Sequence, residues 1–195
     1  MISRQEIPGD FPGNEFMGDS VRKLLKKCAE SAKLFPLAKL CKPDVIEIGE
    51  MARIHDFVFM WGGRGIKIGN YNDIQPFVNI WGGGEAILGD YISIGGGSQL
   101  LTATYDYNGY RMVDGLPDGH TNTLFGKLVI ESDVYVGVNC TIMPNVTIGE
   151  GAVIGGGSFV NKDVESWSVY VGSPAKKIGQ RPRLKDHIRD WKPPV

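Results

Sequence analysis

The stretch NVTIGEGAVIGGGSFVNKDV, residues 145–164, places an aliphatic residue at every sixth position, with glycines and small polar residues between. The same step runs through Val136, Ile142, Ile148, Ile154 and Val160. A period of six fits neither the 3.6 of a helix nor the two of an ordinary strand. Three triplets upstream keep the step of six and are separated by steps of eight: Ile48, Ile54 and Met60; Ile68, Ile74 and Ile80; Leu88, Ile94 and Leu100.

A six-residue unit is long enough for one short strand and one corner, so three units close a triangular coil. The aliphatic residue points into the prism, and glycines suit the corners because they tolerate positive φ. Each coil buries its apolar face only against the next coil. At a spacing of roughly 4.8 Å, about six coils stack into one prism. The sequence therefore predicts an all-β fold, a parallel β-helix over residues 45–175.

The repeat is interrupted once, between Leu100 and Ile130. We expect residues 105–129 to leave the prism wall as a long loop. Loops of this length inside compact domains are usually functional or disordered. The aromatic residues and the histidine of this one argue against plain disorder.

The segments on either side of the repeats do not follow the six-residue spacing. Residues 18–36 have the apolar spacing of an amphipathic helix that ends at Pro36, which predicts an N-terminal helical cap over residues 1–44. Residues 176–195 hold seven Lys or Arg against two Asp in a chain of net charge −1. This basic tail, with a short helix within residues 183–191, fits either an anionic ligand or a solvated surface.

Composition narrows the class of protein. The three cysteines have no CxxC spacing and the three histidines are far apart in the sequence, so we expect no metal. No apolar run has the length of a signal or a transmembrane segment, and no wide basic stripe suggests nucleic acid. We expect a cytoplasmic protein with a small-molecule substrate.

The hexads, the long loop and the terminal blocks IGEGAVIGGGSFVNKDV and VYVGSPAKKI resemble the hexapeptide-repeat acyltransferases over roughly residues 45–181. The stretch TATYDYNG is similar to the loop opening of members that act on nucleotide-linked amino sugars. The resemblance implies a left-handed β-helix, a homotrimer, acetyl-CoA as co-substrate and a sugar or nucleotide-sugar acceptor.

The resemblance also implies which residues bind the cofactor. Gly156, Gly157 and Ser158 match the corner whose backbone lies along the pantetheine arm, and Asn161 and Lys162 follow it. The loop near the adenine matches residues 172–176. The assigned residues there and just beyond are Pro174, Lys176, Lys177 and Arg181. Cations suit the 3′-phosphate and the pyrophosphate.

One departure from the family bears on the chemistry. Relatives that acetylate a hydroxyl open the loop with Thr-Ala-Thr-His and use that histidine as general base, whereas this chain has Tyr105 and then Asp106. An amine needs a weaker proton acceptor than a hydroxyl does, so the change favours an amine acceptor, with Asp106 orienting it or accepting its proton. The alternative is a hydroxyl acceptor with His120, later in the loop, as base.

Three further residues are candidates for substrate contact. Trp61 and Trp81 fall one whole period apart, so they either form a packing ladder at a subunit contact or an apolar wall beside the acceptor. His55 follows a core residue and is either structural or part of the site. His187 belongs to the basic tail and is expected to be solvated.

Together these features predict an acetyl-CoA-dependent transferase. Its expected acceptor is an amine of a nucleotide-linked amino sugar, in the biosynthesis of a surface polysaccharide such as lipopolysaccharide. Two alternatives remain open at this point: an O-acetyltransferase acting on a sugar hydroxyl, and a non-catalytic β-helix used as an assembly scaffold.

Overall fold

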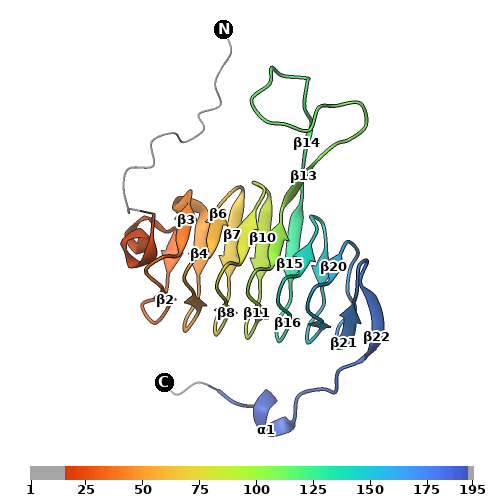
Figure 1. The fold of residues 1–195 in the computed structure, drawn as a ribbon. Coiled ribbons are helices and arrows are strands. Elements are labelled where there is room, and N and C mark those ends of the chain that lie inside the picture. Colours follow the sequence, from red (N-terminus) through yellow and green to blue (C-terminus); the bar gives the residue numbers. More distant parts are fainter. Residues whose placement is uncertain (1–15, 193–195) are drawn as a thin grey trace.

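The computed structural model describes residues 16–192. They form a parallel β-helix of about seven turns, in which three parallel sheets make the walls of a prism (Figure 1). The first 15 residues of the expected cap and residues 193–195 of the tail lie outside the described residues. The predicted parallel β-helix is confirmed.

Each coil gives one short strand to each of three sheets, here called I, II and III. Sheet I contains β1 (Lys27–Cys28), β4 (Ile46–Ile48), β7 (Gly65–Ile68), β10 (Glu85–Leu88), β15 (Lys127–Ile130) and β18 (Thr147–Ile148). Sheet II contains β2 (Lys33–Leu34), β5 (Arg53–Ile54), β8 (Asp73–Ile74), β11 (Ser93–Ile94), β16 (Tyr135–Val136), β19 (Val153–Ile154), β21 (Ser168–Val171) and the antiparallel β22 (Lys176–Gln180). Sheet III contains β3 (Lys39–Cys41), β6 (Phe59–Trp61), β9 (Asn79–Trp81), β12 (Gln99–Leu101), β17 (Thr141–Ile142) and β20 (Phe159–Val160).

The core consists of the residues of the six-residue repeat. All fourteen repeat residues named from the sequence are at most 2% exposed. Neighbouring coils stack them in register, as in the pairs Ile48 with Ile68 and Leu100 with Ile142. The alternating burial along each strand follows from this register, because successive side chains of a strand point to opposite faces.

The expected N-terminal helix is wrong beyond its first turns. A 3₁₀ helix, η1 (Gly18–Leu24), is followed by β1, β2 and β3, which form a complete first coil. A second 3₁₀ helix, η2 (Pro43–Val45), leads into the next coil. The reason is visible in the sequence, since Cys28, Leu34 and Leu40 continue the step of six. Leu34 and Leu40 join the prism core, which outweighs the local helical spacing.

The expected long loop is present as a hairpin that projects from the prism (Figure 1). Its stem pairs β13 (Ala103–Tyr105) with β14 (Thr123–Phe125) in antiparallel fashion. The chain then re-enters sheet I at β15, beside β10. The loop therefore inserts between two adjacent coils without interrupting their stacking.

The C-terminal segment turns back along the prism (Figure 1). After β22 it runs to a short helix, α1 (Asp186–Arg189), within the range expected for one. The ring of Trp191 meets the ring of Tyr71 edge-on, with centroids 5.7 Å apart. Arg183 lies 4.6 Å from the ring of Trp167 in the last coil, so the tail contacts the prism at two separate heights.

Candidate active site

The root of the projecting hairpin is fixed by backbone contacts with the preceding coil. The backbone N–H of Thr102 donates to the carbonyl of Trp81 at 2.8 Å, and the Thr102 hydroxyl donates to the same carbonyl at 3.1 Å. The hydroxyl also accepts from the Gly84 N–H at 3.0 Å. The residues that follow Thr102 are therefore held at a defined corner of the prism.

Asp106 lies just above this root and organises the mouth of the loop. Its carboxylate accepts from the backbone N–H of Asn108 at 2.9 Å, from the Asn108 amide at 2.7 Å and from the Asn122 amide at 3.1 Å. These bonds, the one from the Asn108 backbone first, lower the pKa of the Asp106 carboxyl. A carboxylate has about four acceptor positions, so one remains for a substrate donor.

Tyr105 precedes Asp106 at the end of β13. A hydrogen bond to the carboxylate of Asp114, together with partial burial, raises the pKa of the Tyr105 phenol. The phenol is therefore protonated at neutral pH and is a donor rather than a base. Asp114 was not among the residues expected from the sequence.

His120 is further along the loop than Asp106 and is exposed. Its Nδ1 is 3.1 Å from the carbonyl of Pro117, within a turn of the loop itself. Its own carbonyl accepts from the Arg111 N–H at 2.9 Å. Asn122, which binds Asp106, is closer to the stem, so the described chain does not bring His120 into the Asp106 network.

The two candidate tryptophans are at equivalent positions of sheet III. Trp61 pairs with Cys41 of the coil before, and Trp81 pairs with Leu101 of the coil after. The side chain of Trp81 is 49% exposed, directly before the hairpin root. Close by, the Arg64 guanidinium lies over the Phe125 ring at 4.5 Å, a contact at the hairpin root that sequence patterns did not indicate.

The glycine corner expected to bind the cofactor arm is open to solvent. Gly156 and Gly157 are both exposed, and Gly157 has a φ of 70°. A methyl group built on Gly157 would meet nothing within 4 Å. The backbone of this corner is therefore accessible to an extended ligand.

Ser158 is part of the same corner, but its hydroxyl faces the protein. It is 1% exposed, donates to the Gly155 carbonyl at 2.5 Å and accepts from the Gly172 N–H at 3.1 Å. The hydroxyl thus joins the glycine corner to the loop that carries Pro174. Its hydroxyl therefore has a role in joining the two elements, and contact of Ser158 with a cofactor stays a prediction.

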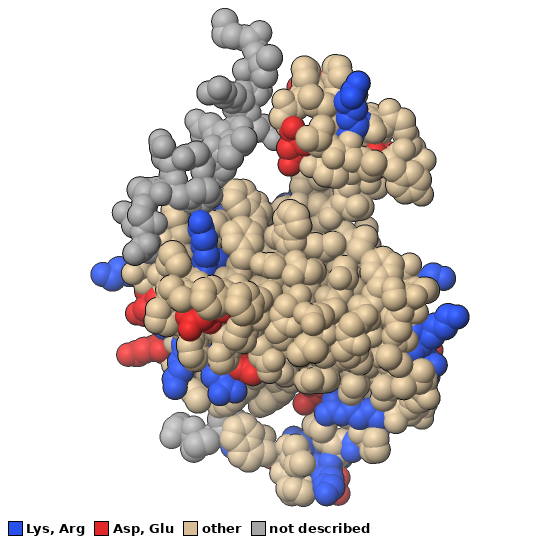
Figure 2. All heavy atoms as spheres, in the orientation of Figure 1, with Lys and Arg blue, Asp and Glu red and all other residues tan. Residues whose placement is uncertain are grey.

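The four candidate cations fall into two groups. Within residues 16–192, Lys162 and Lys176 are exposed and make no ion pair. Lys177 instead binds Glu165 at 2.5 Å, which lowers the pKa of the Glu165 carboxyl and raises that of the Lys177 ammonium. Figure 2 shows Lys and Arg side chains gathered over the C-terminal coils and the tail.

Arg181 is also engaged within the chain. One guanidinium nitrogen donates to the carbonyls of Asp133 at 2.6 Å and Gly151 at 3.1 Å, and the group lies over the Trp167 ring at 5.4 Å. It holds the tail against the last coils, so a cofactor phosphate is better served by Lys162 and Lys176. Asn161 is exposed on the same strand end as Lys162, and Pro174 is exposed in the neighbouring loop.

His55 is well ordered by its neighbours. Its ring stacks on Phe35 at 4.4 Å, and its Nε2 is 2.9 Å from the Asp73 carboxylate. The same carboxylate binds Arg53 at 3.1 Å. These contacts favour the structural interpretation of His55.

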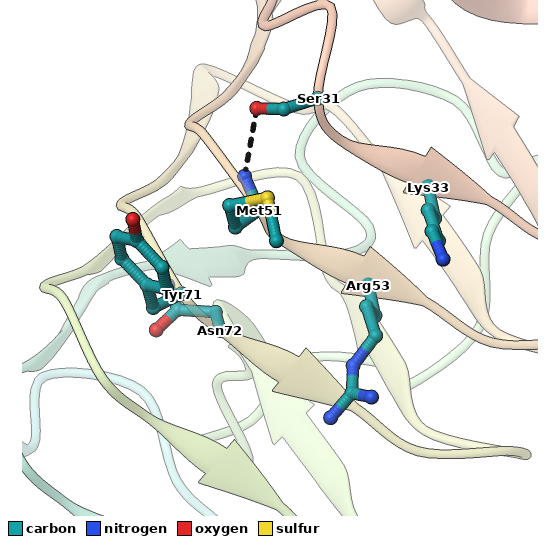
Figure 3. A pocket seen from close by; sticks show the side chains of 6 residues that line it. All are labelled: Ser31, Lys33, Met51, Arg53, Tyr71 and Asn72. Carbon is teal, nitrogen blue, oxygen red and sulfur yellow. Dashed lines mark hydrogen bonds between the residues drawn. The ribbon is translucent and has the colours of Figure 1, made fainter. Parts of the chain in front are cut away.

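A shallow hollow between β2, β5 and β8 lies away from the hairpin (Figures 1 and 3). Figure 3 shows its lining, in which the Ser31 hydroxyl binds the backbone N–H of Met51 at 3.1 Å. Lys33 and Arg53 are on neighbouring strands there, and Arg53 pairs with Asp73. The lining supplies no nucleophile paired with a base, so the hairpin mouth is the better candidate active site.

Residues 16–192 contain neither a cluster of metal-binding side chains nor a membrane-spanning helix. No group of three or more His, Cys, Asp or Glu side chains is arranged to hold a metal ion in that part of the chain. None of its helices is long and apolar enough to cross a membrane.

Comparison with known proteins agrees with this geometry. Residues 127–162 match the family described as bacterial transferase hexapeptide (six repeats). The dTDP-4-amino-4,6-dideoxy-D-glucose acyltransferase of Escherichia coli is 34% identical over 158 residues, covering 80% of this chain and 82% of that protein. The chain belongs to the hexapeptide-repeat acyltransferases.

Solved structures of this acyltransferase family share the fold over most of the chain. A variant of AntD, an N-acyltransferase from Bacillus cereus, is 30% identical, with a TM-score of 0.79 over 85% of this chain and 89% of that one. It was solved in complex with dTDP-4-amino-4,6-dideoxyglucose and coenzyme A. Another AntD structure, with the same identity and TM-score and covering 85% and 88% of the two chains, holds dTDP and 3-hydroxybutyryl-CoA.

Several contacts of the candidate site are not evident from the sequence. Asn108, Asn122 and Asp114 organise the loop mouth, and Glu165 neutralises one candidate cation. Asparagines two and sixteen residues from an aspartate are weak signals in a polar loop, because many spacings there are compatible with a hydrogen bond. Only the fold of the hairpin brings them together.

Proposed function

We propose that this acyltransferase moves an acyl group from acyl-CoA to the 4-amino group of dTDP-4-amino-4,6-dideoxyglucose or a close analogue. The observation that supports this best is the similarity over 80% and 85% of the chain to two proteins described with that nucleotide sugar. The replacement of the expected loop histidine by Tyr105 and Asp106 agrees with an amine acceptor.

In the proposed reaction the neutral amine attacks the thioester carbonyl. The C–N bond forms, the C–S bond breaks, and the thiolate of coenzyme A leaves and takes up a proton. Asp106 is the proposed acceptor for an N–H of the amine, because its carboxylate keeps a free acceptor position at the loop mouth. Backbone N–H groups stabilise the oxyanion, and the hairpin excludes water.

Coenzyme A is proposed to lie along the exposed glycine corner, with its phosphates near Lys162 and Lys176. An extended arm needs accessible backbone without bulky side chains, which Gly156 and Gly157 provide. We further propose a homotrimer in which the hairpin reaches a neighbouring subunit, a cytoplasmic location where acyl-CoA is supplied, and a product destined for a surface polysaccharide. The acyl group is acetyl or a somewhat longer chain.

The test is a thiol-release assay with mass spectrometry of the product. The donor is acetyl-CoA or butyryl-CoA, and the acceptors are dTDP-4-amino-4,6-dideoxyglucose, its 4-hydroxy counterpart, a UDP-linked amino sugar and a free amino sugar. We expect an amide product with the first acceptor and thiol release at the hydrolysis background with the 4-hydroxy counterpart. Esterification of the 4-hydroxy sugar at a comparable rate would refute the amine assignment.

A further inference from the structure

Two ladders of stacked aromatic rings lie on two different corners of the prism. Tyr71 and Tyr91 stack with centroids 5.3 Å apart, and Trp191 of the tail packs on Tyr71. The rings of Phe57 and Phe77 form the second ladder, with centroids 4.9 Å apart and an interplanar angle of 5°, so they are closer and more nearly parallel than the tyrosine rings. In the described part of the chain this second ladder is left open, with Phe57 50% and Phe77 58% exposed.

The phenylalanine ladder is on the same corner as the glycines proposed to bind the cofactor arm. Backbone hydrogen bonds connect this corner from coil to coil: Gly97 N–H to the Pro76 carbonyl at 3.1 Å, Asn139 N–H to Gly96 at 3.0 Å, and Gly157 N–H to Val138 at 2.8 Å. The ladder and the cofactor corner are therefore two ends of one column. A ligand that runs along the column can reach both.

Two glycines and one asparagine follow Phe77 along the column. These are Gly97, Asn139 and Gly157, all with positive φ, and the Asn139 amide lies over Gly97. The corner is thus a track of glycine backbone with one amide side chain over it, and it ends against two phenylalanine rings. Val138 adds a half-exposed apolar group beside the track.

The polar group nearest the ladder in sequence is turned away from it. The Asp56 carboxylate accepts from the backbone N–H of Leu37 at 2.8 Å, so it serves the corner of the preceding coil. Leu37 is itself 44% exposed. The end of the track is therefore apolar, which suits a hydrocarbon chain and not a phosphate.

We propose that the Phe57–Phe77 ladder receives the hydrocarbon part of the acyl group and selects donors with more carbons than acetyl. This inference rests on the proposed function and on the direction it gives to the cofactor. If the phosphates lie near Lys162 and Lys176 on the last coils, the thioester end of the arm points along the track toward Phe77. Burial of each methylene against the rings should favour the longer donor by about fourfold.

The test compares acetyl-, butyryl- and hexanoyl-CoA with the wild type and with Phe77→Gly. Glycine occupies the same column position at Gly97 and Gly157 and suits a positive φ, so the variant removes the ring and keeps the corner. The matched control is Tyr91→Gly, because Tyr91 has a φ of 59°, is 43% exposed and stacks in the other ladder. Both variants are checked for an unchanged sedimentation coefficient.

Two methylenes at about fourfold each give an expected preference of the wild type for butyryl-CoA over acetyl-CoA of about fifteenfold in kcat/KM. Phe77→Gly should lose about tenfold with butyryl-CoA and less than twofold with acetyl-CoA, whereas Tyr91→Gly should keep the wild-type preference. An equal change with both donors, or no change with either, would overturn the proposal. Dissociation of the Phe77→Gly protein into smaller species would assign the ladder to a subunit contact and would also overturn it.

Calorimetric binding of butyryl-CoA and of free coenzyme A separates this inference from the proposed function. If the wild type acylates no nucleotide sugar but binds butyryl-CoA more tightly than coenzyme A, and Phe77→Gly removes the difference, the ladder assignment stands and the proposed acceptor is wrong. If acylation proceeds and the two affinities are equal in both proteins, the acceptor assignment stands and the ladder proposal is wrong.

Discussion

Ser158 joins the two elements proposed to bind coenzyme A, and its removal gives a sharp prediction. The hydroxyl is buried, donates to the Gly155 carbonyl and accepts from the Gly172 N–H. In Ser158→Ala, the Gly172 N–H loses its acceptor. The Gly155 carbonyl keeps a contact with the Cys140 thiol at 3.3 Å. The cost is therefore about that of one unsatisfied donor, roughly 1–3 kcal/mol.

For a chain of this size such a cost lowers Tm by roughly 2–4 °C per kcal/mol, measured at fixed protein concentration. The freed loop at residues 172–176 must also be re-ordered by the cofactor. Ordering one backbone residue costs about 1–2 kcal/mol, so we expect coenzyme A to bind about tenfold more weakly. Differential scanning fluorimetry and isothermal titration calorimetry measure the two effects separately.

Ser98→Ala is the matched control. Ser98 is fully buried, donates to the Gly137 carbonyl at 3.0 Å and accepts from the Cys140 N–H at 3.1 Å, so it has the same bonding pattern in an earlier coil. We expect a similar loss of Tm without the loss of coenzyme A affinity. Equal affinities of the two variants for coenzyme A would refute the role assigned to Ser158.

Three further predictions concern the cations, the loop and the assembly. Replacing Lys162 and Lys176 together by Ala should raise the KM for acyl-CoA about tenfold or more with little change in kcat, because phosphate contacts stabilise the ground state and the transition state alike. Lys177→Ala breaks only the pair with Glu165 and should change KM less. A larger rise in KM for Lys177→Ala than for the double variant would contradict the assignment. His120→Ala should keep kcat within about tenfold, while Asp106→Asn loses more. The lowered pKa of Asp106 keeps its carboxylate charged even below the ordinary value near 4, so Asp106 as the proton acceptor gives no limb of the pH–rate profile at neutral pH. A limb that disappears in His120→Ala would show that His120 is the base. Sedimentation at micromolar concentration should give a trimer, and a monomer would contradict both the assembly and a site shared between subunits.

The sequence was most informative where one interaction repeats. Each hexad residue points into the prism for the same reason, so the period predicted the coils, their core and the interruption after Leu100. It failed at the first coil, where Val21, Leu25 and Cys28 satisfy a helical spacing while Cys28, Leu34 and Leu40 satisfy the coil spacing. Stacking on the second coil decides between them, and that tertiary contact cannot be seen in an isolated segment.

The candidate site was less predictable than the fold, because its side-chain partners also depend on tertiary contacts. The resemblance implies that Lys177 and Arg181 bind the cofactor, but neither the resemblance nor their charge reveals a partner that folding brings close. Glu165 is twelve residues from Lys177, and the Asp133 carbonyl is 48 residues from Arg181. The glycine corner is different, because the exposure of Gly156 and Gly157 follows from the local turn.

The returning tail has a consequence for how the protein unfolds. In a stack of coils each unit contacts only its neighbours, so a terminal coil can fray while the others remain intact. Here the tail links Trp167 of the last coil to Tyr71, which belongs to the third, through Arg183 and Trp191. Detachment of the final coil therefore also costs a contact four coils away. Amide hydrogen exchange should reveal the third to seventh coils opening as one cooperative unit, which a plain one-dimensional array would not do.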